Sequence, residues 1–228
     1  QTELWAIYAN VDIEGVQAGM AIDLLYQIAE DGDFHADMHG GNVMVDATPD
    51  QESVSLIDAG STGESKEKQR FGEAVDARTD FLDFGMNLLL LKSGLGDVDR
   101  VAEVIRKYTN TGDQNYWQTE VRKALEKSET VGDVFKEVLA EVLRVTEGKL
   151  DVDFRYLLKA LASAGGHLEA LRSKITGHVL TSFASMDTPG ALPPQMVLMQ
   201  APEIQKLLPL LPRMPVLAGM LGALMPSA

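Results

Sequence analysis

The sequence predicts a mainly α-helical fold that contains one small β-hairpin. Apolar residues recur about every four positions from Val16 to Ile28, as expected of a helix with one buried face. Between residues 42 and 58, apolar residues instead alternate with polar ones on both sides of the turn-rich segment DATPDQES, which is typical of two short strands. From Gly63 to about residue 186 the helical spacing returns. These three observations predict the fold class.

The first expected element is a strand over residues 3–13, followed by the helix that ends at Asp31-Gly32-Asp33. The next segment, FHADMHGGN, is too rich in glycine and polar residues for a regular element and is interpreted as a loop. After the hairpin, Ser61 and Glu64 fit a capping box that leads straight into a long helix. The helices expected from there on are residues 66–92, 98–108, 114–127, 131–147 and 152–171.

The composition is that of a globular protein with an acidic surface. Apolar residues make up 45% of the chain and charged residues 24%, which suits a chain that buries a core and excludes disorder throughout. The formal net charge of −14 repels phosphate backbones, so we expect no nucleic-acid partner. Because the chain has no cysteine, it has neither disulfides nor thiolate metal sites.

Two regions of the chain differ in character, residues 1–190 and residues 191–228. Seven of the nine prolines lie in the second region, with leucine and methionine between them. We expect an extended apolar tail that packs on a partner or on its own domain. The alternatives are contact with a membrane surface and a helix that spans the membrane. Internal prolines disfavour a spanning helix. In the first region, small residues from Ala162 to Gly166 offer a place where another helix can approach closely.

Three polar residues between positions 35 and 60 predict phosphoryl-transfer chemistry. Asp37 and Asn42 lie five positions apart in the predicted loop, and Asp58 follows the hairpin just before Ala59-Gly60. Phosphoryl transfer from ATP needs one carboxylate that orients the attacking hydroxyl, and oxygen ligands that hold magnesium against the phosphates. The hairpin brings these groups together, which predicts Asp37 as the orienting residue and Asn42 and Asp58 as the magnesium ligands.

In these motifs the chain resembles the UbiB family of atypical kinases, also called aarF-domain or ADCK-like kinases. The family signature GFFHADPHPGN, followed by a hairpin that ends in DFG, corresponds here to GDFHADMHGGN and LIDAG, with the helix AGMAIDLLYQIAED before them. The late segment LLKALASAGGHLEAL is similar to the closing helices of the family. The resemblance covers roughly residues 3–175 and is most specific at residues 32–60. It implies a protein-kinase-like C-lobe, a hinge strand at residues 3–13, and ATP and magnesium as cofactors if the protein is active.

The chain departs from the family in three respects. Four features of the family precede the hinge: the phosphate-binding lysine, its glutamate partner, the alanine-rich loop and the KxGQ motif. This chain begins at the hinge with Gln1. We therefore expect an upstream segment to be missing, and with it the N-lobe. Met38 and Gly40 stand where the family has prolines. Ala59 replaces the phenylalanine of DFG. Together these changes predict a reduced demand for catalysis.

Other interpretations of the same residues stay open at this stage. His35, Asp37 and His39 alternate as the ligands of a metal hydrolase do. Aminoglycoside and choline kinases carry a similar loop, and a polar hairpin that merely contains acids is the simplest alternative. We interpret His167 and His178 as ordinary helix-surface or packing residues, and the Tyr116-Trp117 pair as a core or interface anchor.

These observations predict a degenerate UbiB-like kinase lobe that acts as an accessory or structural subunit of a larger, membrane-bound assembly. The apolar tail would contact the other subunits of that assembly. In this function the chain needs no cofactor. The alternative is the catalytic half of an ATP- and magnesium-dependent kinase or ATPase that supports isoprenoid quinone metabolism. The short connection after Gly60 lacks a segment that would dock a protein substrate, so any substrate is expected to be small or lipid-like. The resemblance implies a mitochondrial or chloroplast membrane, or the cytoplasmic face of a bacterial membrane.

Overall fold

The computed structural model describes residues 12–48, 51–58, 60–184 and 192–223. Most of these residues are helical, as the sequence predicts. The longer helices are α2 (Ile13–Tyr26), α3 (Arg78–Leu91), α4 (Val98–Thr109), α5 (Gln114–Lys127), α6 (Val131–Thr146), α7 (Val152–Ser163) and α8 (Gly165–Ala184). The shorter helical segments are η1 (Gln27–Asp31), η2 (Gly40–Asn42), α9 (Pro194–Met199), α10 (Pro202–Leu207), η4 (Leu208–Arg213) and α11 (Pro215–Ala223).

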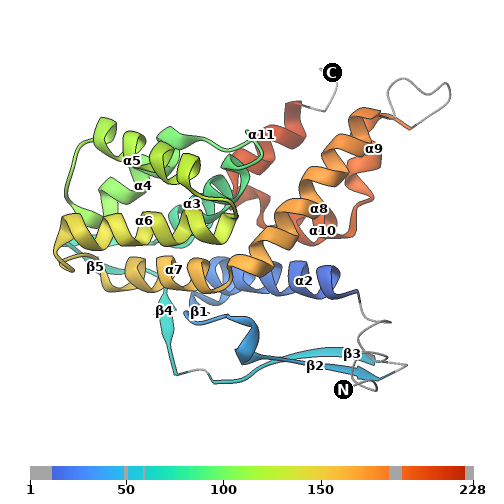
Figure 1. Cartoon of the computed structure of the whole chain (residues 1–228), viewed down its shortest axis with the longest axis horizontal. Coiled ribbons are helices and arrows are strands. Elements are labelled where there is room, and N and C mark those ends of the chain that lie inside the picture. Colours follow the sequence, from blue (N-terminus) through green and yellow to red (C-terminus); the bar gives the residue numbers. More distant parts are fainter. Residues whose placement is uncertain (1–11, 49–50, 59, 185–191, 224–228) are drawn as a thin grey trace.

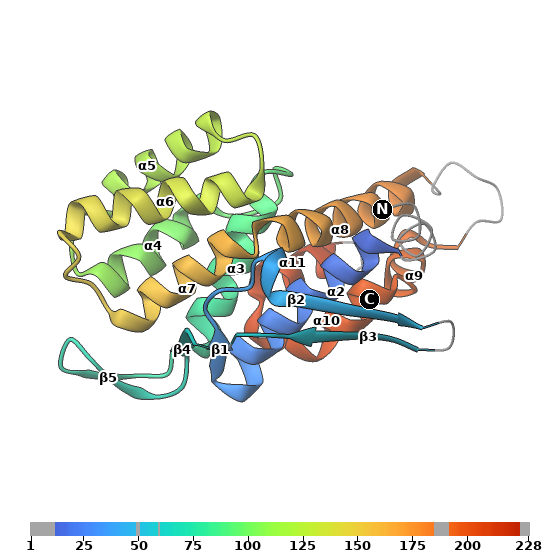
Figure 2. The same cartoon turned by 60° about the horizontal axis from the view of Figure 1, so that its bottom comes forward.

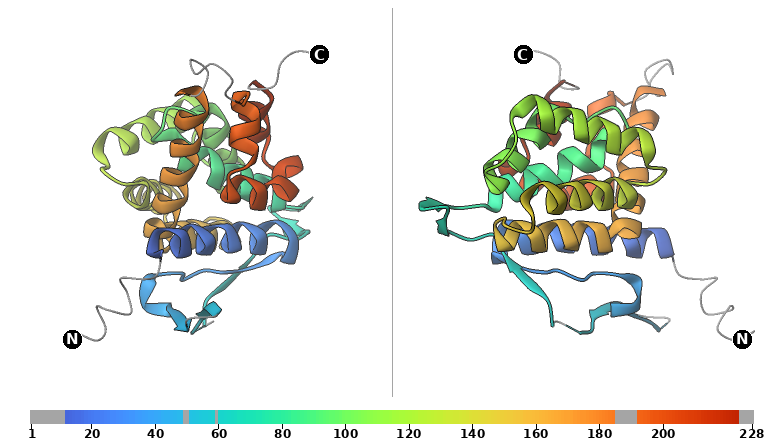
Figure 3. Two further views of the ribbon diagram at one scale, coloured as in Figure 1. Left: turned by 90° about the vertical axis from the view of Figure 1, so that its right-hand side faces the viewer. Right: turned by 60° about the vertical axis from the view of Figure 1, so that its left-hand side comes forward.

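Among the described residues, six short strands form three separate antiparallel pairs. They are β1 (Asp33–His35), β2 (Val43–Thr48), β3 (Gln51–Leu56), β4 (Thr62–Glu64), β5 (Lys68–Arg70) and β6 (Glu73–Val75). β1 pairs with β4, β2 with β3, and β5 with β6. The β2–β3 hairpin confirms the hairpin predicted over residues 42–58, and it lies along α2 on one side of the helical body (Figures 1 and 3). A mainly helical fold with small two-stranded sheets is therefore confirmed, whereas its assignment as a kinase-like lobe remains a prediction.

Helix α2 leads into the predicted site. The carboxylate of Asp12 caps it by accepting a hydrogen bond from the Gly15 N–H at 2.9 Å, which lowers the pKa of Asp12. At the other end, η1 is a π-helical turn that stops at Gly32, whose φ of 78° suits glycine. The strand predicted over residues 3–13 lies almost wholly outside the described residues, and its last residue, Ile13, is already the first residue of α2.

Residues 33–42 contain more regular structure than the sequence predicts. Instead of an uninterrupted loop, they form the strand β1 and the 3₁₀ turn η2. The ring of Phe34 holds β1 in place by packing edge-on against Phe81 of α3, with 6.3 Å between ring centroids. The partner strand must have glycine at position 63, because a Cβ there would lie 2.4 Å from the Phe34 ring.

The segment between Gly60 and α3 is the largest error in the sequence prediction. The helix expected from residue 66 begins only at Arg78, and the expected capping box at Ser61 and Glu64 is wrong because residues 62–64 form β4. Residues 68–75 form a hairpin that projects from the body at β5 (Figure 2). The connection after Gly60 is therefore not the short one that the sequence predicts.

A buried arginine explains why this hairpin forms. The side chain of Arg70 is 1% exposed, donates to the Val75 carbonyl at 2.9 Å, and forms ion pairs with Asp151 and Asp153 at the start of α7. A buried guanidinium needs such partners, since an unpaired one is very costly. The turn itself uses positive φ at Phe71 and Gly72.

The predicted close approach of helices occurs between α6 and the start of α8. A Cβ on Gly165 would lie 2.5 Å from the Cα of Gly132, so the two backbones touch. The single helix expected over residues 152–171 is wrong, however, because the chain turns at Ala164 between α7 and α8. The predicted helices over residues 114–127 and 131–147 agree with α5 and α6.

The described part of the tail packs on the chain's own domain. It is helical rather than extended, and its buried side chains include Leu207, Leu210 and Met214. Its polar contacts with the body include a hydrogen bond from the Tyr26 hydroxyl to the Lys206 carbonyl at 2.7 Å and a contact of 2.9 Å between His178 and Glu203. Arg213 also lies 3.8 Å from the carboxylate of Glu30. No helix among residues 12–48, 60–184 and 192–223 is long and apolar enough to cross a membrane.

The glycine contact allows a direct test of the helix packing. We expect Gly165→Ala to lower the free energy of unfolding by about 1–3 kcal/mol, because the new methyl group overlaps the α6 backbone. Gly166→Ala is the matched control: no atom lies within 4 Å of its added Cβ, so it should be neutral or stabilise the fold by up to about 1 kcal/mol. Urea unfolding measures both, and equal effects of the two substitutions would contradict the packing.

The buried imidazole of His167 predicts a loss of stability in acid. It is 6% exposed, its ring nitrogens have no hydrogen-bond partner among the described residues, and burial lowers its pKa from the ordinary value of 6.5. Protons therefore bind more readily to the unfolded chain. We expect the free energy of unfolding to fall as the pH drops below about 6.5, by up to about 1.4 kcal/mol per pH unit.

Urea unfolding at pH 7.5 and at pH 5.5 measures this dependence. His167→Leu should reduce the difference between the two pH values, whereas Gly166→Ala, which removes no titratable group, should leave it unchanged. An unaltered difference in His167→Leu would mean that other groups cause the acid sensitivity.

Candidate functional site

The loop that contains Asp37 is held at its start by backbone and side-chain bonds. The His35 N–H donates to the Gln27 Oε1 atom of η1 at 2.9 Å, and the Ala36 N–H donates to the Ser61 carbonyl at 2.8 Å. The second bond continues the β1–β4 pairing, in which His35 lies opposite Thr62. The segments before and after the β2–β3 hairpin are therefore joined at the base of the loop.

The side chain of His35 connects Asp37 with Asp58. It is only 6% exposed, its Nδ1 atom accepts from the Asp37 N–H at 3.1 Å, and its Nε2 atom lies 2.9 Å from the Asp58 carbonyl oxygen. An N–H can only donate, so Nδ1 carries no proton. The Asp58 carbonyl can only accept, so Nε2 carries it. His35 is thus a neutral imidazole whose two nitrogens are both used in holding the backbone of the two aspartates.

The strand pairing places Asn42 beside the Asp58 segment. Val43 pairs with Leu56, and one step further the Ile57 N–H donates to the Asn42 carbonyl at 2.9 Å. The Asn42 amide nitrogen also donates to the Asp37 carbonyl at 3.0 Å. Because the nitrogen is used as a donor, the amide oxygen is the atom of this side chain that suits a cation. The structure therefore brings the three predicted site residues into one cluster.

Asp58 has a backbone conformation that is unusual for a residue other than glycine. Its φ is 62°, in the left-handed region, and its Oδ1 atom accepts from the Gly60 N–H at 3.3 Å. Aspartate tolerates this region because its short side chain can bond to the backbone two residues on. Such conformations gather at functional sites, where the surrounding structure imposes them.

Lys159 of α7 also belongs to this cluster, and the sequence analysis missed it. Its Nζ atom lies 3.2 Å from Asp37 Oδ2 and 3.3 Å from Ser61 Oγ. The side chains of Lys159 and Asp37 are 44% and 33% exposed, so this contact lies at the surface. The one signal in the sequence is a cation within the apolar run LLKAL of a predicted helix.

The donor set suits magnesium better than a softer metal. Two carboxylates and an amide carbonyl are hard oxygen ligands, which Mg²⁺ prefers, and magnesium usually keeps several waters beside its few protein ligands. Among the residues that the structure describes, no group of three or more His, Cys, Asp or Glu side chains could hold a metal ion. A site here would therefore depend on Asn42 and on oxygens of the bound substrate.

Residues 6–86 match the ABC1 atypical kinase-like domain. This match contains Asp37, Asn42 and Asp58 and confirms, over this segment, the resemblance to the UbiB and ADCK-like kinases. No curated protein sequence and no solved structure matches the chain. The match covers the segment that carries the candidate site, and the roles of its three polar residues remain predictions.

Within the ABC1-like segment, the contacts of the histidines argue against a metal hydrolase. Both ring nitrogens of His35 are taken up by backbone groups, so this side chain cannot bind a metal without breaking the loop. The Nδ1 atom of His39 accepts from the Gly41 N–H at 3.0 Å. The alternation of His35, Asp37 and His39 is therefore explained by the loop itself.

A pocket of about 330 Å³ lies within the ABC1-like segment, between α2, η1 and the end of β3. Two of its lining residues, Asp23 and Asp31, are acidic, and burial raises the pKa of Asp23. Carboxyl groups repel phosphate oxygens, so this hollow is a poor site for the phosphates of a nucleotide.

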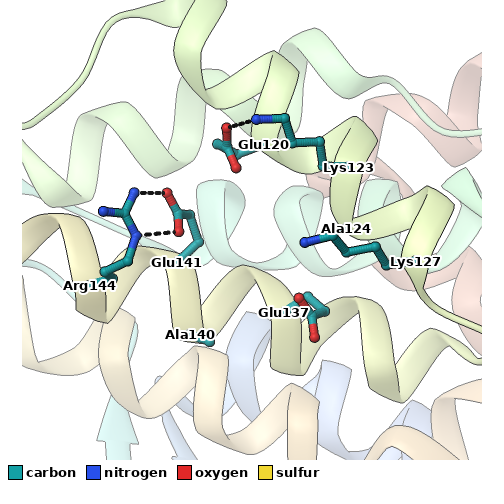
Figure 4. Close-up of a pocket in the computed structure, with 8 residues that line it drawn as sticks. All are labelled: Glu120, Lys123, Ala124, Lys127, Glu137, Ala140, Glu141 and Arg144. Carbon is teal, nitrogen blue, oxygen red and sulfur yellow. Dashed lines mark hydrogen bonds and ion pairs between the residues drawn. The ribbon is translucent and has the colours of Figure 1, made fainter.

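A second pocket, of about 140 Å³, lies between α5 and α6, on the side of the helical body away from the β2–β3 hairpin (Figures 1 and 4). Its charges are mostly neutralised in pairs. Arg144 binds Glu141, which also accepts from the Tyr116 hydroxyl, and these bonds lower the pKa of Glu141 to about 2. Beside it, Trp117 is buried and donates to the Thr111 carbonyl at 2.7 Å, so the Tyr116-Trp117 pair packs as predicted. We assign no function to this pocket.

His35 can be tested separately from the residues that would bind a ligand. We expect His35→Ala to lower the free energy of unfolding by about 1–3 kcal/mol, because it leaves a partly buried N–H and a carbonyl without their partner and removes a buried ring. The Asp37 amide should also exchange its hydrogen faster, which exchange measured by NMR would report. His39→Ala is the control, since its ring is exposed and bonds only locally. An unchanged Asp37 amide in His35→Ala would contradict the assigned tautomer and bond.

Proposed function

We propose that this chain binds ATP with magnesium through the loop of Asp37, Asn42 and Asp58 and supports phosphoryl transfer or ATP hydrolysis. The bridge made by His35 is the observation that carries this proposal. A buried, fully bonded histidine holds two aspartates that are 21 positions apart in the sequence, and a polar hairpin without a ligand would not need this order. The ABC1 match over the same residues supports the proposal.

Each residue has a distinct role in this proposal. Asp37 lies in the loop between β1 and η2, where its carboxylate would orient the attacking hydroxyl or water. Asn42, whose carbonyl accepts from the Ile57 N–H, and Asp58, the next residue along the chain, would hold magnesium. When bound, magnesium would neutralise charge on the phosphates. The backbone held by His35 would keep the two carboxylates at a constant separation.

The substrate class rests on the family resemblance alone. One reason to expect a small or lipid-like substrate was a short connection after Gly60, but residues 61–77 contain three strands. A role in isoprenoid quinone metabolism and a place at an organellar or bacterial membrane therefore remain proposals from the resemblance.

Calorimetric titration with ATP and magnesium tests the proposal. We expect binding that requires magnesium and that Asp58→Ala abolishes, with Asn42→Ala weakening it at least about tenfold, or 1.4 kcal/mol. Glu126→Ala, an exposed substitution on α5 that changes the charge equally, is the control and should bind as the unchanged chain does. If the chain does not bind ATP at millimolar concentration, the proposal is wrong.

A role as an accessory subunit is the second candidate, and exposed apolar side chains favour it. Leu180 and Phe183 at the end of α8 are 64% and 49% exposed, and Met196 of α9 is 49% exposed. Exposed apolar groups that lie together often mark a contact with a partner or a membrane. In this function the kinase-like loop would be degenerate, as Ala59 suggests, and the titration above would show no magnesium-dependent binding.

A further inference from the structure

Lys159 reaches the candidate site from a part of the chain that the ABC1 match does not include. It lies on α7, whose buried residues Phe154, Leu157 and Leu158 fix the helix in the core. Its ammonium group contacts Asp37 from the segment before the β2–β3 hairpin and Ser61 from the segment after it. One side chain thus contacts both polar segments of the loop.

The charge of the site makes this contact informative. Asp37 and Asp58 contribute two negative charges, and His35 is neutral because its Nδ1 accepts a backbone hydrogen bond. A polyphosphate that approached these carboxylates would be repelled without positive charge beside them. In the part of the chain that the structure describes, Lys159 is the cation whose contacts place it at Asp37. A lysine ammonium is a compact point charge and a common phosphate ligand.

We propose that Lys159 binds the terminal phosphate of the nucleotide, with the Ser61 hydroxyl as a second donor beside it. The nature of this ligand rests on the proposed function. The ammonium group has three donors, so it can keep its contact with Asp37 while it donates to a phosphate oxygen. Its 44% exposure leaves it open to an incoming anion. In this position it would hold the phosphate next to the carboxylate that orients the attacking group.

A purely structural role explains the contact less well. Ion pairs exposed to this degree contribute little to stability, and α7 is already held by its buried residues and by the contacts of Asp151 and Asp153. Lys136 on α6 provides a comparison, because it forms an exposed pair with Asp133 at the same distance of 3.2 Å, and Asp133 is not a residue of the candidate site. Removal of either lysine should leave the fold intact.

Calorimetric titration of the full chain with three probes tests the proposal: Mg·ATP, Mg·ADP, and tripolyphosphate without metal. We expect Lys159→Ala to weaken Mg·ATP binding at least about tenfold, as for the loss of a charge-assisted hydrogen bond, and Mg·ADP binding less than about threefold. Lys159→Arg should keep ATP affinity within about threefold, since it preserves the charge. Lys136→Ala should change neither affinity, and all variants should melt within a few degrees of the unchanged chain.

The outcomes separate this inference from the proposed function. If the chain binds Mg·ATP, Asp58→Ala abolishes binding and Lys159→Ala does not weaken it, then the proposed function stands and the role of Lys159 is refuted. An equal loss of ATP and ADP affinity would also overturn contact with the terminal phosphate. If the chain binds no Mg·ATP, the proposed function fails and tripolyphosphate decides: binding that Lys159→Ala removes supports the phosphate site, and no binding refutes it.

Discussion

The order of the candidate site depends on one buried side chain, the neutral imidazole of His35. An imidazole without partners in this position would be costly, and a protonated one would have no acceptor for its Nδ1 hydrogen, because the group that faces Nδ1 is itself an N–H. The bonds that satisfy the ring are the same bonds that hold the backbone of Asp37 and Asp58. The bonds that satisfy this polar group therefore also build the site. They hold the Asp58 segment while its backbone adopts the left-handed conformation.

Local patterns predicted the elements whose stabilising contacts are local. Helices α4, α5 and α6 have clear apolar spacing and capping residues, and their predicted ranges agree with the structure. The β5–β6 hairpin could not be found in this way. Its stability depends on Arg70, whose partners Asp151 and Asp153 lie about eighty residues later in the sequence. The segment KEKQRFGE has no apolar stripe, which in retrospect argued against a helix from residue 66.

The same distinction applies to the site. The grouping of Asp37, Asn42 and Asp58 follows from a loop and a hairpin that are contiguous in the sequence, and spacing alone predicted it. Lys159 lies 122 positions from the aspartate that it contacts, and only the packing of α7 brings the two together. A motif identifies residues that the chain places near one another by local structure. It does not identify a side chain that arrives through tertiary packing.

The position of Lys159 along the loop is set by both ends of α7. At its start, Asp153 accepts from the Glu64 N–H of β4 at 3.1 Å and binds Arg70, which ties the helix to the strand that pairs with β1. Just past its end, Gly165 lies in backbone contact with Gly132. A helix rises about 1.5 Å per residue, so these two contacts leave little freedom for the helix to slide. The ion pairs of Arg70 with Asp151 and Asp153 and the Gly132–Gly165 contact therefore fix the position of α7, and with it the position of the Lys159 ammonium group beside Asp37.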